Sequence, residues 1–193
     1  MNISLSNILF ILIIFQLSFL SFFLFTQEKG KRISNILLGL FFISISLNLL
    51  DVFLLMTGVY SSNPWLAGWG STLPLLFGPF IYFYTLSVLN KDFAFNSNSW
   101  KHFFPFVIFF LATEIYFLVQ PHNIQETVLS NVIRHDIPKS ISIVSTLIFI
   151  QFLLYVIASF RLISSYKKNA GQYFSNKKKR DVSWLSSTIL FFY

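Results

Sequence analysis

The feature that most constrains this chain is a series of five apolar runs, each about as long as a lipid bilayer is thick. A helix needs about 20 apolar residues to cross the hydrocarbon core, and it satisfies its own backbone hydrogen bonds there. The runs that qualify are residues 5–25, 33–56, 65–89, 102–119 and 141–163. The sequence therefore predicts an all-α fold, a polytopic transmembrane helical bundle.

A sixth apolar run covers residues 182–193, where the printed chain ends. At about 1.5 Å per residue it reaches about 18 Å, which is too short to cross a membrane. We therefore expect five full spans and a truncated sixth, all within one sensor-like transmembrane domain over residues 1–193. The first run has no basic segment before it and no cleavage site after it, so we expect it to be retained.

The composition agrees with a membrane protein and argues against a soluble domain. Only 11% of the residues are charged, whereas soluble domains average about 25%. Hydrophobic residues make up 55% of the chain, and the mean hydropathy is +0.68. There are no cysteines, so disulfide frameworks, thiolate metal sites and cysteine nucleophiles are excluded.

The positive charge follows the pattern of membrane topology rather than that of a nucleic-acid surface. The net charge is +7, and twelve of the 14 Lys and Arg residues lie in segments 26–32, 90–101 and 161–181. The other two, Arg134 and Lys139, lie in the alternate segments. Because cytoplasmic loops of membrane proteins are enriched in Lys and Arg, this asymmetry predicts an N-terminus outside.

Two acidic residues lie within the apolar runs, Asp51 in the second and Glu114 in the fourth. Ser44, Asn48 and Asp51 are spaced i, i+4, i+7 and so share one helical face, which we expect to point into the bundle. Ionisable groups inside a membrane are costly and often functional. Asn48, Asp51 and Glu114 are thus candidates for ligand sensing. The alternative interpretation, hydrogen bonding between helices with Asp51 reaching toward the surface, stays open.

Prolines interrupt two of the runs and are candidates for hinges or packing positions. Pro74, Gly78 and Pro79 lie in the third run, and Pro105 follows His102 near the start of the fourth. A proline inside a helix frees a carbonyl and bends the axis, while a glycine lets a neighbouring backbone approach. These positions indicate either hinges of a signalling bundle or a static shape.

A basic run precedes the sixth apolar run. It consists of Lys177, Lys178, Lys179 and Arg180. Such a run can bind anionic lipid headgroups at about 1 kcal/mol per basic residue, and it serves equally well as a topology determinant.

The sequence offers no positive support for an enzyme. It has no glycine-rich phosphate loop and no Ser/His/Asp constellation. The segment 120–139 contains His122, Glu126, His135 and Asp136, but their spacing matches no metal site. We expect this segment to be a solvated loop, and we expect no catalytic site, metal or cofactor.

Several short motifs resemble a known family. They run from Ser34-Asn-Ile-Leu-Leu-Gly-Leu40 through Leu76-Phe-Gly-Pro-Phe-Ile-Tyr-Phe-Tyr84 and Trp100-Lys-His-Phe-Phe-Pro-Phe106 to a basic segment before Ser183-Trp-Leu. Nearly the whole chain is thereby similar to the N-terminal membrane region of AraC-type transcriptional regulators of Bacteroidetes. In that family an outside-in bundle of about seven spans precedes a cytoplasmic helix-turn-helix DNA-binding domain.

The resemblance implies a membrane-embedded signal-input domain in the bacterial inner membrane, multi-pass and without its DNA-binding output domain. Its partner is then the lipid bilayer, with DNA contacted only through the missing domain, and a homodimer is compatible with it. The positions characteristic of the family would be Gly78, Pro79, Tyr82, Tyr84, His102 and Pro105. Two alternatives stay open: a small transporter or channel component with Asp51 and Glu114 along the path, or the membrane sensor of a histidine kinase.

Overall fold

The computed structural model of the chain describes residues 5–134 and 138–173, without the side chains of 140 and 169–173. The elements are α1 (Leu5–Thr26), α2 (Arg32–Met56), α3 (Val59–Ser62), η1 (Pro64–Leu66), α4 (Pro74–Leu89), α5 (Ser97–Trp100), η2 (Lys101–Phe103), α6 (Phe104–Leu118), α7 (His122–Ile133) and α8 (Lys139–Tyr173). The described part is all-helical, as predicted. The sixth apolar run and the basic residues 177–180 lie outside the described residues.

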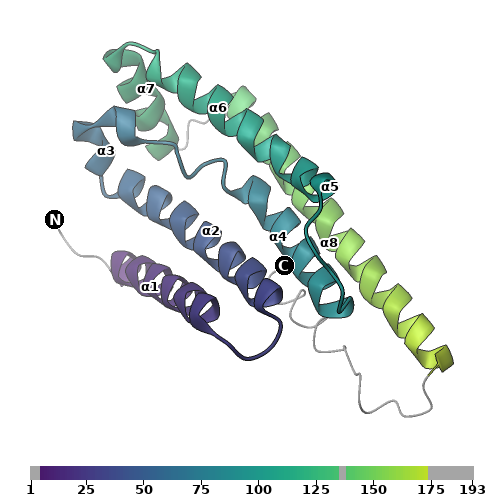
Figure 1. Cartoon of the computed structure of the whole chain (residues 1–193). Coiled ribbons are helices and arrows are strands. Elements are labelled where there is room, and N and C mark those ends of the chain that lie inside the picture. Colours follow the sequence, from purple (N-terminus) through teal and green to yellow (C-terminus); the bar gives the residue numbers. More distant parts are fainter. Residues whose placement is uncertain (1–4, 135–137, 174–193) are drawn as a thin grey trace.

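The helices α1, α2, α4 and α8 lie side by side in that order across the bundle (Figure 1). α1 packs on α2, α2 on α4, and α4 on α8. The central helices α2 and α4 therefore supply most of the core. Its buried residues are Leu37, Phe41, Phe42, Leu76, Phe80, Ile81, Phe83, Tyr84, Val156 and Ile163. We call the end of the bundle near α3, η1 and α7 the α3 end, and the opposite end, where α2 begins, the Lys31 end.

Four helical segments of the described residues are long and apolar enough to cross a membrane. They are Leu5–Thr26, Arg32–Met56, Ser97–Leu118 and Ile141–Lys168. α4 is apolar but has only 16 residues, about 24 Å of helix, whereas the hydrocarbon core is about 30 Å thick. α6 has no buried residue, and large apolar side chains are exposed on α1, α6 and α8. Such surfaces are typical of helices that face lipid.

The third apolar run differs from the span expected over 65–89. It is helical only over Pro74–Leu89, and the residues before it form η1 and a series of turns. Gly68 has φ +98°, a backbone conformation that ends a helix and that side chains with a Cβ rarely adopt. Pro74 then takes the first position of α4, where its missing N–H costs nothing. Hydropathy alone could not show this break.

The segment expected as a solvated loop over 120–139 contains α7, so that expectation was wrong. The side chains that α7 turns toward the bundle are buried or partly buried and spaced i, i+3, i+4, i+7. They are Gln125, Val128, Leu129 and Val132. This spacing places them on one face of a helix, which packs against η1, α2 and α3. α7 therefore covers the α3 end of the bundle.

Small residues allow α1 and α2 to approach closely. The Ser21 hydroxyl donates to the Gly39 carbonyl at 2.8 Å, and the hydroxyls of Ser18 and Ser46 lie 2.8 Å apart. A Cβ on Gly39 would lie 2.5 Å from the Phe25 ring. Small residues of this kind are common at contacts between membrane helices, where the hydrophobic effect does not drive association.

At the Lys31 end, one lysine ties two helices together. Its Nζ donates to the carbonyls of Ser87, Asn90 and Lys91 at 3.2, 2.7 and 2.9 Å. These carbonyls belong to the last turn of α4 and the residues after it, where a helix leaves acceptors unpaired and carries partial negative charge. Lys31 thus has a structural contact besides the topological role that its charge suggests.

Candidate functional site

A chain of hydrogen bonds surrounds Asp51 at the α3 end. The Tyr60 hydroxyl donates to Asp51 Oδ1 at 2.7 Å, and the Trp69 indole N–H donates to the Tyr60 oxygen at 3.0 Å. Asp51 is buried, with 7% of its surface exposed, although it lies in the last turns of an apolar helix. Burial and the adjoining Asp51 carboxylate raise the pKa of Tyr60, so its phenol stays protonated and serves as a donor.

The turn at Gly68–Gly70 lies between the two acidic residues. The Asn48 amide donates to the Gly70 carbonyl at 2.9 Å. A Cβ on Gly70 would lie 2.4 Å from the Asp51 Cβ, and one on Gly68 would lie 3.7 Å from Glu114 Oε1. The two acidic side chains thus lie against the same short turn, Asp51 at Gly70 and Glu114 at Gly68. Glycine is thus required at position 70 because the backbone passes directly against the Asp51 side chain, and it is favoured at position 68 by the positive φ.

The structure brings together the three ligand-sensing candidates of the sequence, from α2 and α6, around this turn. Ser44, expected on the same face, is buried but bonds to the Leu40 carbonyl of its own helix at 2.6 Å. Tyr60 and Trp69 were missed, because no sequence pattern links them to Asp51. We call Asn48, Asp51, Tyr60, Trp69 and Glu114 the α3-end polar network.

The groups of this network largely satisfy one another: Asp51 accepts from Tyr60, Tyr60 accepts from Trp69, and the Asn48 amide donates to the Gly70 carbonyl. Glu114 adds a second carboxyl group beside the turn, and ionisable groups inside membrane proteins are often functional. In the described residues no group of three or more His, Cys, Asp or Glu side chains could hold a metal ion. His122 and Glu126 of α7 form an exposed pair at 3.5 Å, outside the network.

A second constellation lies where α4 crosses α8. Pro79 lies inside α4 and cannot donate to the carbonyl four residues earlier, that of Leu75. The Gln151 side chain of α8 donates to this carbonyl at 3.2 Å. A carbonyl without a hydrogen bond is costly in a membrane. Pro79 of α4 therefore leaves the Leu75 carbonyl as an acceptor for the Gln151 amide of α8.

Replacing Gln151 by Met should destabilise the α4–α8 contact, by about 0.6 kcal/mol, the mean for side-chain hydrogen bonds between membrane helices. The loss of stability should be small, because methionine removes not only the donor Nε2 but also the Gln151 Oε1, which is buried without a hydrogen bond. Combined with Pro79→Ala, the same change should cost nothing, since residue 79 then donates to Leu75 within α4. Thermal unfolding of the four proteins of this cycle in detergent measures the coupling; equal losses in both backgrounds would contradict it.

Several positions that the sequence resemblance singled out, among them Gly78, Tyr82 and His102, lie at this contact of α4 with α8. A Cβ on Gly78 would lie 2.5 Å from the ring of Tyr155, so α4 and α8 are in backbone-to-ring contact. The Tyr155 hydroxyl lies 2.7 Å from His102 Nδ1, and the ring of Tyr82 stacks on His102 with centroids 5.9 Å apart. Tyr84 points into the core. Glycine, histidine and aromatic residues therefore join α4, η2 and α8.

Two of the three proline candidates start helices instead of interrupting them. Pro74 is at the first position of α4 and Pro105 at the second position of α6, where a backbone N–H has no acceptor within the α-helix. Neither therefore removes a hydrogen bond from the interior of its α-helix. Pro79 alone of the proline candidates lies in the interior of a helix.

No protein-family model, curated protein or solved structure matches this chain.

Proposed function

We propose that this chain is the membrane-embedded signal-input domain of a membrane-bound AraC-type transcriptional regulator of the bacterial inner membrane. The observation that carries the proposal is the α3-end polar network, which gathers side chains from α2, α3, α6 and the turn at Gly68–Gly70. In the proposed topology this end faces outward, and the basic segments face the cytoplasm. The network then lies opposite the side where DNA is found.

A signal at the network has a direct structural route to the other face. The turn at Gly70 precedes α4 by four residues, so a ligand that displaces Asp51 or Glu114 also moves the start of α4. α4 contacts α8 through Gly78 and through the Leu75 carbonyl. α8 has 35 residues, about 52 Å, which exceeds the thickness of a bilayer core, so in the proposed topology its excess length extends on the cytoplasmic side.

The proposed orientation, with five full spans and the N-terminus outside, predicts the result of reporter fusions. Alkaline phosphatase joined after Ser130 should be active, because α7 then lies outside, and the enzyme joined after Gly171 should be inactive. Green fluorescent protein at the same two points should give the opposite pattern. Phosphatase activity at Gly171 but not at Ser130 would reverse the orientation and place the polar network on the cytoplasmic side.

The regulatory output predicts that the coding sequence beyond Tyr193 continues through the remaining spans into two helix-turn-helix motifs. In that full-length regulator, Glu114→Gln should change expression of a target promoter while binding of the isolated DNA-binding domain stays the same. A kinase domain beyond Tyr193 would instead identify a histidine-kinase sensor. The proximity of Asp51 and Glu114 also suits a transport path, and solute flux into proteoliposomes abolished by Glu114→Gln would favour that function.

A further inference from the structure

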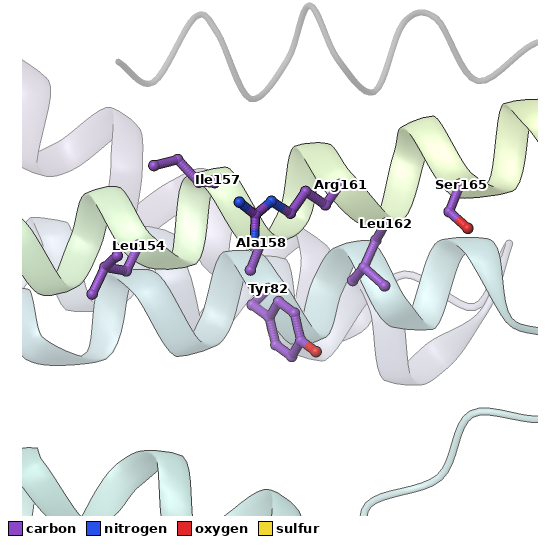
Figure 2. Close-up of a pocket in the computed structure, with 7 residues that line it drawn as sticks. All are labelled: Tyr82, Leu154, Ile157, Ala158, Arg161, Leu162 and Ser165. Atoms are coloured by element: carbon purple, nitrogen blue, oxygen red, sulfur yellow. The ribbon is translucent and has the colours of Figure 1, made fainter.

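A hollow of about 480 Å³ runs along α8 beside Tyr82 of α4 (Figure 2). The α8 residues that line it are Leu154, Ile157, Ala158, Arg161, Leu162 and Ser165. Most of this lining is aliphatic, and it also holds a guanidinium group and two hydroxyls. We call this hollow the Arg161 groove.

Arg161 carries its charge on an apolar helix, and the described residues place no carboxylate beside it. It lies within the membrane-length segment Ile141–Lys168. Among the residues that the structure describes, no carboxylate pairs with it, and the ion pair found there joins His122 and Glu126. Figure 2 shows its side chain extending along α8 toward Ala158. A charged group in such a place needs water or an anion beside it.

The neighbouring helix indicates the level at which Arg161 lies in a membrane. The contact between His102 Nδ1 and the Tyr155 hydroxyl sets η2, directly before α6, in register with α8. Arg161 lies six residues, about 9 Å, beyond Tyr155 toward the Lys31 end. Trp100 and Lys101 precede His102 on that side, and Trp100 is 62% exposed. Tryptophan and basic residues are typical of the headgroup level, so Arg161 lies there too.

We propose that the Arg161 groove binds an anionic phospholipid of the leaflet at the Lys31 end. Along α8 the lining changes from Leu154 and Ile157, toward the bilayer centre, to Arg161 and then Ser165. This order matches that of a lipid: acyl chain, phosphate diester, polar headgroup. The guanidinium donates to the phosphate oxygens, and an acyl chain lies against the aliphatic part. The site is independent of the regulatory output and of the α3-end polar network.

The test uses the whole chain purified in detergent, mixed with equal amounts of phosphatidylglycerol and phosphatidylcholine that carry identical acyl chains. Native mass spectrometry then counts the lipids bound. We expect a preference for phosphatidylglycerol that falls about fivefold in Arg161→Gln, the effect of one basic group near an anionic headgroup. Lys168→Gln is the matched control, because it removes one exposed charge from the same helix outside the groove and should keep the preference.

Further variants separate a lipid site from general charge attraction. Ala158→Trp fills the groove and keeps Arg161, so it should also abolish the preference in protein that still elutes as a monodisperse species. Equal losses in Arg161→Gln and Lys168→Gln, or no preference in the unmodified chain, would overturn the proposal. Displacement of phosphatidylglycerol by millimolar inorganic phosphate would overturn it as well, since the groove would then be a site for free anions.

Discussion

Asp51→Ala should unfold the α3 end of the bundle. The substitution removes the acceptor of the Tyr60 hydroxyl and leaves this buried phenol, to which the Trp69 indole donates, without an acceptor of its own. A buried polar group left unpaired costs about 1–3 kcal/mol. The cavity beside Gly70 adds to this loss, because the Asp51 side chain is what the turn packs against.

Two measurements detect the effect of Asp51→Ala. The midpoint of thermal unfolding in detergent should fall, and amide hydrogen exchange should accelerate over residues 57–73. Glu126→Ala is the matched control, since this carboxylate lies at the same end but is half exposed and outside the network. Asp51→Asn keeps an acceptor oxygen and should lose less than Asp51→Ala. Equal behaviour of Asp51→Ala and Glu126→Ala would show that the network contributes nothing to stability.

Gly78→Ala should destabilise the packing of α4 on α8. Its Cβ would meet three carbons of Tyr155 at 2.5, 2.9 and 3.0 Å, all of them near the α8 backbone. These atoms cannot move aside without moving α8, and overpacking of this kind costs about 1–3 kcal/mol. Because Tyr155 also contacts His102, the displacement should reach the start of α6.

A double-mutant cycle separates this clash from any general effect of alanine in the helix. Tyr155→Ala removes the ring and so most of the obstructing atoms. Gly78→Ala should then be nearly neutral or slightly stabilising, since alanine is the better helix former. Thermal unfolding of the single and double variants gives the coupling. If Gly78→Ala costs the same with and without the Tyr155 ring, the close packing of α4 on α8 is not its cause.

Much of the architecture was predictable from the sequence for a simple physical reason. The free energy of transferring a segment into an apolar environment is approximately the sum of the contributions of its residues. This sum does not depend on which residues the segment contacts in the folded protein. The bounds of α1 and α2 therefore lie within a residue of the expected 5–25 and 33–56. The resemblance to AraC-type regulators, the orientation and the lipid role of residues 177–180 stay predictions.

The candidate site was predictable only in part. Asn48 and Asp51 stood out because polar residues are rare within apolar runs, and their spacing placed them on one helical face. Tyr60 and Trp69 carry no such signal, since tyrosine and tryptophan are common near the ends of membrane helices. The hydrogen bond from Gln151 to the Leu75 carbonyl joins residues far apart in the chain, so the sequence could not predict it either.

The sequence by itself thus determined the all-α class, the apolar segments and the rare polar positions within them. Only the tertiary structure decided where the third run breaks, because hydropathy averages over Gly68 and Gly70 while the backbone turns there. It also decided which groups form hydrogen bonds. Tyr60 donates to Asp51, and Gln151 donates to the Leu75 carbonyl that Pro79 leaves without a donor in α4. Hydrophobicity is a property of single residues, whereas hydrogen bonds and close packing depend on distances that only the folded chain sets.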